Sequence, residues 1–427
     1  FSHHSVDITH IFFEMWNVCV LLFVLLGETG VRAFTLFPAP SPFKRPALRR
    51  HAVSSLRAEQ QLDTAAVREA VQRTASLPFD DPSKVRVVVA GATGYIGKFV
   101  VREFVNQGFQ TVAFVRPGAT VREDLFEGAE IRHGQATDLD DIRQNAFGDE
   151  QVDVVVSCLA SRSGTKSDSW AVDYQATKNM LDVAVEKGAK HFILLSAFCV
   201  NIPKLQFQHA KLKVEADIRK ATEEGKLTHA IARPTAFFKS LSGQLETVQQ
   251  GWPFIAFTIG GERVCKCNPI SEPDLAAFMV ECARNPSKWN RAIPVGGPGP
   301  ALSMEDQGRL MYEATGKGEP AYWKFPIEIF DPIIGAFDWM GQFFPQMEDA
   351  AELARIGKYY GEYDMLTGPD VKGAEGEIWG EDLLGDHYKK IAVEGQEYDP
   401  YTTMFGGGKK EKSQAEEGKE RETVGAA

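Results

Sequence analysis

Short apolar runs alternate with longer amphipathic stretches through the middle of the chain. Residues 85–89 (VRVVV) are rich in β-branched side chains, which is typical of a strand buried on both faces of a parallel sheet. Apolar residues then recur at helical spacing over residues 99–105. Further apolar runs predict strands at 110–115, 131–137, 152–158, 191–196 and a sixth strand that ends at 231–235. This alternation predicts an α/β fold built on a doubly wound parallel sheet.

The turn after the first expected strand is rich in glycine, with the spacing G-x-x-G-x-x-G. Strand, glycine turn and helix in this order indicate a dinucleotide site, whereas a glycine-rich surface turn is the alternative. The first glycine permits the tight turn, the second lets the backbone approach a pyrophosphate, and the third lets the helix pack close to the strand. The expected cofactor-binding residues here are Gly91, Thr93, Gly94, Tyr95, Ile96 and Gly97.

The second expected strand ends at Arg116, and no acidic residue occurs between Gly108 and Arg122. NAD-binding units place an Asp or Glu about 20 residues after the glycines, where it bonds the ribose 2′-hydroxyl. A guanidinium pairs with a 2′-phosphate, which a carboxylate would repel. The sequence therefore predicts NADPH as the cofactor, and the alternative is a strand-end arginine in solvent.

Two other strand ends supply candidate cofactor contacts. Asp138 follows the third expected strand and either meets the adenine amine or caps a helix. Leu159 and Ala160 follow the fourth, and ligands of parallel sheets gather at the carboxyl ends of strands. We therefore expect both segments beside the cofactor.

The helix after the fifth expected strand has Phe207 and Lys211 where short-chain dehydrogenases have Tyr-x-x-x-Lys. In that motif the Lys holds the nicotinamide ribose and lowers the pKa of the Tyr, which protonates a substrate oxygen. Tyr174 and Lys178 have the right spacing, but they precede the fifth strand, so we interpret this match as a coincidence.

An enzyme without this phenol is poorly equipped to reduce a carbonyl. It can still deliver a hydride to a carbon–carbon double bond whose developing charge spreads into a conjugated system. A non-catalytic sensor of NADP(H) would also lack the tyrosine, and Lys211 would then be an ordinary exposed lysine of the helix.

Composition narrows the class of protein. The chain has 427 residues, 44% of them hydrophobic, and its formal net charge of −11 argues against a general nucleic-acid binder. Its cysteines form no C-x-x-C pair, and Cys265 and Cys267 have no further Cys or His at ligand spacing. We therefore expect no metal site and interpret the cysteines as buried, reduced thiols.

The first 58 residues have the composition of a targeting leader. Residues 1–33 contain an apolar run too short to span a membrane and are typical of a signal peptide. Residues 34–58 are rich in basic residues, Ser and Pro and have no Asp or Glu, as transit peptides do. Together they resemble the two-part leader of proteins sent to algal plastids of secondary origin. A single secretory signal followed by a disordered spacer is the alternative.

Beyond the leader we expect a cofactor-binding core over 84–240 and a smaller substrate-side region over 241–400, interleaved with it. Residues 326–345 predict an amphipathic helix, which packs on the protein or makes a peripheral contact with a plastid membrane. A short helix is expected near 381–393, and 405–427 has the composition of a disordered tail. Aromatic residues expected either in the core or on a flat apolar binding surface are Phe237, Phe238, Trp252, Phe254 and Phe257.

Several motifs together resemble those of one family. They are GATGYIGKFVV (91–101), VVVSCLASRSG (154–164), DSWAVDYQATKN (168–179), AKHFILLSAFCV (189–200), FQHAKLKVEA (207–216), ARPTAFFKSLSGQ (232–244) and ISEPDLAAF (270–278). From about residue 85 to 360 the chain is similar to the NADPH-dependent divinyl chlorophyllide a 8-vinyl reductases of plants and algae. Those enzymes are atypical, NmrA-like short-chain dehydrogenases with a Rossmann fold.

The resemblance implies reduction of the C8 vinyl group of divinyl chlorophyllide a or protochlorophyllide a to ethyl. It implies that Lys211 holds the nicotinamide ribose and that Pro234 and Thr235 border the nicotinamide amide. Ser196 and His209 are candidate proton donors. His209 could equally be a magnesium ligand or a surface residue, and the surface interpretation is the better one. The alternatives are another NmrA-like or isoflavone-reductase-like reductase of the plastid, or a redox sensor.

Overall fold

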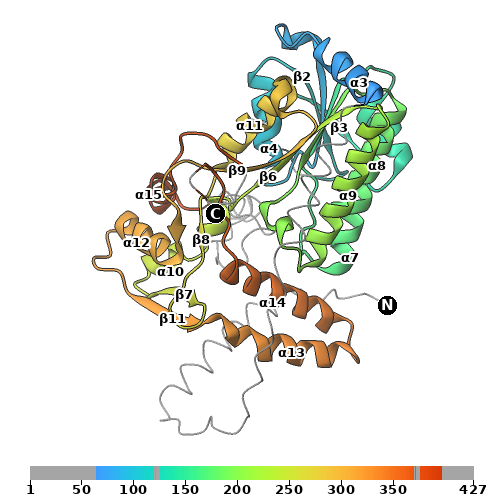
Figure 1. Cartoon of the computed structure of the whole chain (residues 1–427). Coiled ribbons are helices and arrows are strands. Elements are labelled where there is room, and N and C mark those ends of the chain that lie inside the picture. The colour runs from blue at the N-terminus through green and yellow to red at the C-terminus, as the bar shows by residue number, and fades with distance from the viewer. Residues whose placement is uncertain (1–63, 120, 122–125, 370, 372–375, 397–427) are drawn as a thin grey trace, which may run out of the picture. The chain divides into compact units, whose positions relative to one another are not determined.

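The computed structural model describes residues 64–119, 121, 126–369, 371 and 376–396, which belong to one unit spanning 59–427 (Figure 1). The expected leader segments, 1–33 and 34–58, and the expected tail, 405–427, lie outside the described residues. A central eight-stranded sheet has the order β12-β9-β6-β5-β4-β1-β2-β3, and every neighbouring pair is parallel. Its strands are β1 Arg86–Ala90, β2 Gln110–Val115, β3 Glu130–His133, β4 Val154–Ser157, β5 His191–Leu195, β6 Thr228–Pro234, β9 Arg291–Gly296 and β12 Glu377–Ile378.

The strand order confirms the predicted doubly wound α/β fold, because the chain runs outward from β1 in both directions. The third strand is shorter than expected. It ends at His133 rather than near residue 137, since the chain turns at Ala136 and Thr137, just before the short helix α6, Leu139–Asp141. The carboxyl ends of β1, β4 and β5 lie side by side, so the loops that follow them meet at one edge.

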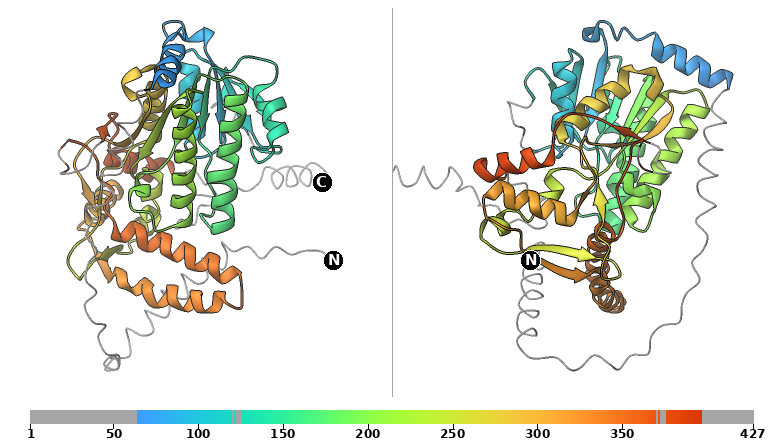
Figure 2. Two further views of the ribbon diagram at one scale, coloured as in Figure 1. Left: turned by 45° about the vertical axis from the view of Figure 1, so that its right-hand side comes forward. Right: turned by 60° about the vertical axis from the view of Figure 1, so that its left-hand side comes forward.

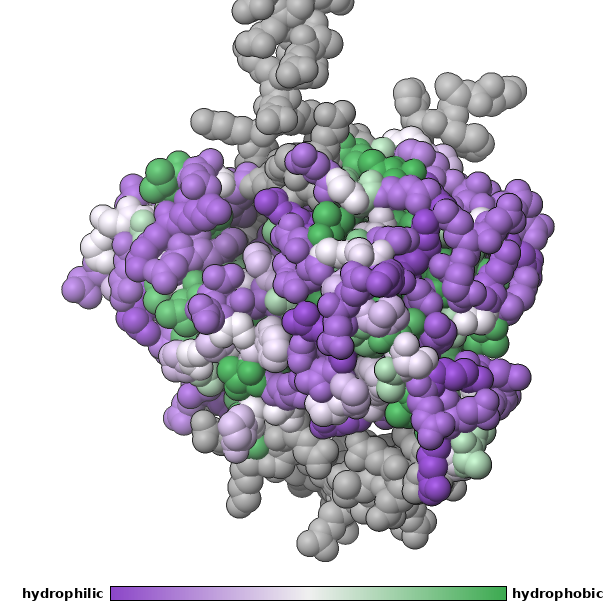
Figure 3. All heavy atoms as spheres, turned by 90° about the horizontal axis from the view of Figure 1, so that it is seen from above, coloured by the Kyte–Doolittle hydropathy of each residue, from purple (hydrophilic) through white to green (hydrophobic). Residues whose placement is uncertain are grey.

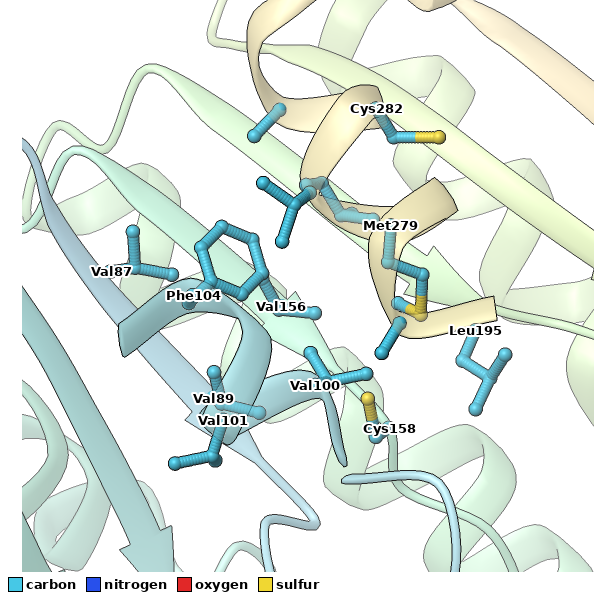
Figure 4. Packing of buried hydrophobic residues seen from close by; sticks show 14 of the residues in the cluster. Val87, Val89, Val100, Val101, Phe104, Val156, Cys158, Leu195, Met279 and Cys282 are labelled. Carbon is cyan, nitrogen blue, oxygen red and sulfur yellow. The ribbon is translucent and has the colours of Figure 1, made fainter. Parts of the chain in front are cut away.

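Helices cover both faces of the sheet. On one face, α4 (Gly97–Asn106) and α11 (Glu272–Arg284) pack on alternate residues of β1, including Val87 and Val89 (Figure 4). The opposite face, to which Val88 points, is covered by α8 Thr177–Glu186, α9 Gln206–Glu223 and the wider helical segment η2 Ile142–Phe147. Burial of β1 on both faces explains why its sequence is an apolar run without alternation.

The helix before β5 changes its winding along its length. It opens as a wide helical segment, η3 (Ser169–Ala176), and continues as α8. Asp173 lies in the middle of η3 and is buried, although its segment has no amphipathic pattern of its own. A further helix, α3 (Ala65–Ala75), starts at Thr64 and reaches β6 through a hydrogen bond between the Thr74 and Thr228 hydroxyls.

After β6 the chain leaves the sheet and returns twice, as β9 and β12. The region between builds two small sheets, in which β7 (Phe254–Thr258) pairs in parallel with β11 (Tyr322–Pro326) and β8 (Lys266–Cys267) pairs with β10 (Leu302–Ser303). The helices packed around them are α10 Leu245–Gln249, α12 Met304–Thr315 and α15 Leu384–Glu394. Shorter helical segments are α7 Lys166–Asp168, η1 Pro82–Lys84, η4 Phe198–Asn201, η5 Lys239–Leu241 and η6 Pro286–Lys288.

The helix expected over 326–345 is present as η7 (Ile327–Ile329) followed by α13 (Phe330–Gly341). It forms a hairpin with α14 (Gln346–Glu362), and the two helices lie side by side (Figure 2). Among the described residues no helix is both long and apolar enough to span a membrane. The surface at the end of the molecule that carries α3 is mostly hydrophilic, with scattered apolar residues (Figure 3).

Candidate functional site

The glycine turn between β1 and α4 leaves no room for side chains at two positions. Gly91 has a φ of +74°, and a Cβ there would lie 2.6 Å from the carbonyl oxygen of Cys158. A Cβ on Gly97 would lie 2.1 Å from the carbonyl oxygen of Gly91. Gly94, between them, is exposed and donates its N–H to the same oxygen at 3.0 Å. The turn is therefore tight, and the helix begins directly against it.

This turn fits the pyrophosphate of a dinucleotide. Helix α4 begins at Gly97 after Ile96, and no side chain accepts a hydrogen bond from its first N–H groups. Uncapped N–H groups at a helix N-terminus attract an anion. Thr93 is half-buried in the turn, while the Tyr95 hydroxyl accepts a hydrogen bond from the Lys239 N–H at 3.0 Å and so ties the turn to the segment after β6.

The residues expected around the adenosine lie at the neighbouring strand ends. Arg116 is exposed and directly follows β2, which pairs with β1. The Asp138 carboxylate accepts hydrogen bonds from the N–H groups of Asp140 at 2.8 Å and Asp141 at 3.2 Å, so it caps α6. Of its two expected roles, helix capping is the one that these contacts support.

The loop after β4 touches the glycine turn. A Cβ on Gly91 would lie 2.9 Å from the backbone nitrogen of Leu159, and Ala160, the next residue, is exposed. Pro234 ends β6 and is buried, and the Thr235 hydroxyl donates to the Asn268 carbonyl at 2.6 Å. The hydroxyl hydrogen of Thr235 is therefore already used, and only backbone atoms of Thr235 are available for a contact at this edge.

Lys211 is buried at the carboxyl ends of β4 and β5. Its Nζ lies 3.0 Å from Oδ1 of Asp173, and the two side chains are only 7% and 1% exposed. Nζ also donates to the Leu195 carbonyl at 3.4 Å, and the other Asp173 oxygen accepts the N–H of Ser161 at 3.2 Å. An exposed helical lysine is therefore excluded, because this ammonium is enclosed between two strand ends.

Ser196 and His209, the candidate proton donors, are placed differently. The Ser196 hydroxyl donates to Oε1 of the fully buried Glu215 at 2.6 Å, so its hydrogen is already committed. Burial alone would raise the pKa of Glu215, but the guanidiniums of Arg233 and Arg219 outweigh it and hold the pKa below its usual value. His209 is exposed, as expected of a surface residue.

Comparison with known proteins identifies the family to which this chain belongs. Residues 91–286 match a family described as NAD(P)H-binding. A chloroplastic divinyl chlorophyllide a 8-vinyl-reductase of Cucumis sativus is 44% identical over 331 residues, which cover 74% of this chain and 78% of that protein. The Zea mays protein of the same name is 38% identical, with 84% and 92% covered. This protein belongs to the divinyl chlorophyllide a 8-vinyl-reductase family.

Within the solved structures, a leucoanthocyanidin reductase–NADPH complex from Vitis vinifera aligns with this family member at a TM-score of 0.51 and 17% identity. The alignment covers 72% of this chain and 99% of that one. At this identity the similarity supports the fold, which is the NAD(P)-binding Rossmann fold that the sequence predicts.

In this 8-vinyl-reductase family member the Tyr-x-x-x-Lys match before β5 consists of two partly exposed residues. The Tyr174 ring packs edge-on against Trp170, with centroids 5.8 Å apart, and Lys178 pairs with Asp182 one helical turn away. Phe207, on the first turn of α9, is half-buried and packs on a cluster that includes residues of α14. The helix after β5 is therefore the one that carries the buried lysine.

Four of the five aromatic residues expected in the core or on a binding surface differ clearly in burial. Phe238 and Phe254 are almost fully buried in the cluster formed with α12 and α15, so the core interpretation holds for these two. Phe237 is partly buried against the Tyr95 ring beside the glycine turn, with centroids 5.9 Å apart. Trp252 is 53% exposed.

The sequence reasoning missed Asp173, Glu215 and helix α14. Asp173 lies within one of the motifs that resemble the family. A buried Lys211 needs a buried acidic partner, and this requirement was the signal that could have identified Asp173. Glu215 follows Lys211 by one helical turn and bonds residues of β6 and of the loop after β5. No helix was expected at α14, and its contact with α9 joins residues far apart in the chain.

Proposed function

We propose that this protein reduces the C8 vinyl group of divinyl chlorophyllide a, or of the corresponding protochlorophyllide a, to an ethyl group with NADPH. The observation that supports this most directly is the buried pair of Lys211 and Asp173 next to the glycine turn, on a helix with Phe207 in place of the phenol. This arrangement retains the lysine of a short-chain dehydrogenase without its carbonyl acid. The family's named activity, saturation of a vinyl group, agrees with that chemistry.

Residues at the carboxyl edge of the sheet would hold NADPH. The glycine turn binds the pyrophosphate, and Arg116 pairs with the 2′-phosphate, with Asp138 nearby at the adenine end. Leu159 and Ala160 line the middle, while Pro234 and Thr235 border the nicotinamide amide. When bound, the reduced nicotinamide supplies the hydride.

Lys211 positions the nicotinamide end in this proposal. Its Nζ has three hydrogens, of which the contacts with Asp173 and the Leu195 carbonyl use two. The remaining N–H is available to a ribose hydroxyl. Asp173 holds the ammonium in place, so that Lys211 orients the ribose without moving when the cofactor binds.

An assay with purified protein tests the proposal. Divinyl chlorophyllide a and divinyl protochlorophyllide a are each incubated with NADPH or NADH, and the monovinyl products are separated by chromatography. We expect product with NADPH and little with NADH. NADPH binding without any monovinyl product would refute the activity and favour a redox sensor.

The variants Lys211→Ala and Lys178→Ala separate the two lysines in the same assay. Lys178→Ala alters only the partly exposed pair with Asp182, so turnover should stay at the wild-type level. Lys211→Ala should lose most of the turnover and bind NADPH more weakly. Unchanged turnover in Lys211→Ala would remove this lysine from the mechanism.

We infer a plastid location from the chloroplastic relatives and from the two-part leader expected in residues 1–58. A fluorescent protein fused behind residues 1–58 tests it in an alga with a secondary plastid. Fluorescence in the plastid supports the two-part leader, whereas secretion would indicate a single signal peptide.

The hairpin of α13 and α14 supports a peripheral contact with the plastid membrane. The α13 acids Asp331 and Asp338 pair with Lys358 and Arg355 of α14. The aromatic residues that remain exposed at the end of the hairpin are Trp339 (63%), Phe343 (65%) and Phe344 (60%). Aromatic side chains of this kind insert at the interface of a bilayer.

Flotation with uncharged galactolipid vesicles tests this contact. Wild-type protein should float with the vesicles, and the triple variant of Trp339, Phe343 and Phe344 to Ala should not. Val393→Ser, at an exposed apolar residue of α15, is the control and should float like wild type. Equal flotation of wild type and the triple variant would exclude the hairpin as the contact.

A further inference from the structure

The glycine turn that fits a pyrophosphate brings no charged side chain of its own. Residues 91–97 (GATGYIG) are all uncharged, and so are residues 158–161 (CLAS), which follow β4 and touch the turn at Gly91. Lys98, the first basic residue after the turn, lies over the ring of its neighbour Phe99, with Nζ 5.5 Å from the centroid. The N–H groups at the start of α4 attract an anion, but a pyrophosphate carries a full negative charge on each phosphate. A side-chain cation from another segment would complete this site.

Lys239 reaches the turn from the segment after β6. It is the first residue of η5, and its N–H donates to the Tyr95 hydroxyl at 3.0 Å and lies 3.4 Å from Oε1 of Glu272, on the first turn of α11. The preceding residue, Phe238, is 2% exposed in the cluster formed with α12 and α15. The backbone of Lys239 is therefore held from both sides, between the cofactor-binding core and the substrate-side region.

The side chain of Lys239 also contacts the turn. Its Nζ lies over the Tyr95 ring, 5.1 Å from the centroid, and the Phe237 ring packs against the same tyrosine. The face of an aromatic ring attracts an ammonium, so Tyr95 holds this charge close to the turn of which it is part.

The chemistry of this side chain suits a phosphate group. A lysine ammonium is a compact positive charge on a flexible stem, and it binds phosphates as a point charge. The stem of Lys239 starts from a backbone that is already fixed by Tyr95, so little order is lost when the ammonium meets an anion on the turn.

We propose that Lys239 is a cofactor-binding residue whose ammonium pairs with the pyrophosphate of the dinucleotide. This rests on the placement of the pyrophosphate over the glycine turn in the proposed function. NADPH and NADH share the pyrophosphate, so Lys239 serves both, whereas Arg116 serves only the 2′-phosphate of NADPH. The two cations therefore have different roles: Arg116 selects the dinucleotide, and Lys239 strengthens the binding of either one.

Fluorescence titrations with NADPH and with NADH test the proposal in the variants Lys239→Gln and Arg116→Gln. Lys239→Gln should weaken the binding of both dinucleotides by the same factor, about 10- to 100-fold. Arg116→Gln should weaken NADPH alone. The two contacts involve different phosphates, so their factors should multiply for NADPH in the double variant.

Lys213→Gln is the control for the loss of one positive charge. Lys213, on α9, pairs with Asp217 at 2.8 Å, and its side chain is 49% exposed. This variant should bind both dinucleotides within about twofold of wild type. Added salt should weaken binding in wild type and in Lys213→Gln, and less steeply in Lys239→Gln, because one ionic contact is missing there. A purely structural role for Lys239 would leave the salt dependence unchanged.

Two further variants complete the test. Lys239→Arg keeps the charge and should recover most of the affinity. Lys239→Met keeps the apolar stem beside the Tyr95 ring and decides the matter if Lys239→Gln does not fold. Unchanged binding of both dinucleotides would overturn the proposal, and so would a loss confined to NADPH. A loss confined to the pigment would also overturn it and would assign the ammonium to a carboxylate of the pigment. Absence of dinucleotide binding by wild type would instead refute the cofactor site of the proposed function.

Discussion

Lys211→Met isolates the energy of the buried ion pair at the centre of the site. Methionine keeps the length and apolar stem of lysine but removes the ammonium. Asp173, with a side chain only 1% exposed, then keeps a single hydrogen bond, from the Ser161 N–H. Removing one partner of a buried pair leaves the other as a buried charge without a counter-ion.

The expected cost of Lys211→Met is about 3–5 kcal/mol of unfolding free energy, the range for broken buried pairs. Asp173→Asn should cost a similar amount, because it strands the ammonium. The double variant removes both charges, so it should lose less than the sum of the singles, with a coupling energy of at least about 2 kcal/mol.

The pair Lys178–Asp182 is the matched control within the same chain. It joins the same residue types across one turn of α8, but its side chains are 27% and 49% exposed. Its coupling energy should be about 0.3–0.5 kcal/mol. Urea unfolding of the two sets of variants at pH 7.5 gives both values, and a Lys211–Asp173 coupling as small as that of the control would refute the buried pair.

Three other outcomes are expected. The Cβ of Gly97→Ala would meet the Gly91 carbonyl oxygen at 2.1 Å, so this variant should lose about 1–3 kcal/mol of stability and should not bind NADPH. Gly335→Ala, which lies in open space on α13, is the control and should be stabilised by about 0.5–1 kcal/mol in thermal unfolding. Arg116→Gln should weaken NADPH about 10- to 100-fold in fluorescence titrations and leave NADH unchanged. Burial lowers the pKa of His229 to about 3, so below pH 6.5 only the unfolded chain takes up this proton. This group alone should contribute about 1.4 kcal/mol to the stability lost between pH 7.5 and 5.5. His229→Asn should lack that part of the pH dependence, and an equal pH response in both proteins would contradict it.

The cofactor half of the molecule was predictable because its signals are local. A strand buried on both faces needs an uninterrupted apolar run, as in β1, and the following turn needs glycine at position 91, where φ is positive, and at 97, where backbone meets backbone. Strands β2 and β5 were likewise expected to within one residue. Each of these features depends on neighbours in sequence.

The remainder was not predictable because it depends on partners that are distant in sequence. Strands β9 and β12 are recognisable only by their pairing with β6 and with each other. Asp173 is a polar residue in a segment without amphipathic pattern, and only the fold brings it to Lys211, 38 positions further on. The exposure of the aromatic residues at the end of α13 was unpredictable for the same reason, because the acidic residues of α13 form ion pairs with residues of α14.

The start of α9 connects the two halves of the protein. From the cofactor side, Glu215 binds Arg233 of β6, and Arg233 in turn donates to Asn201 before the helix at 2.9 Å. From the substrate side, the Glu352 carboxylate of α14 accepts the Gln206 N–H at 2.7 Å, where a negative charge also suits the helix dipole. The first turns of α9 carry Phe207 and Lys211, so a shift of α14 would move residues at the nicotinamide end. The contact between Glu352 and Gln206 therefore ties the position of α14 to that of Phe207 and Lys211.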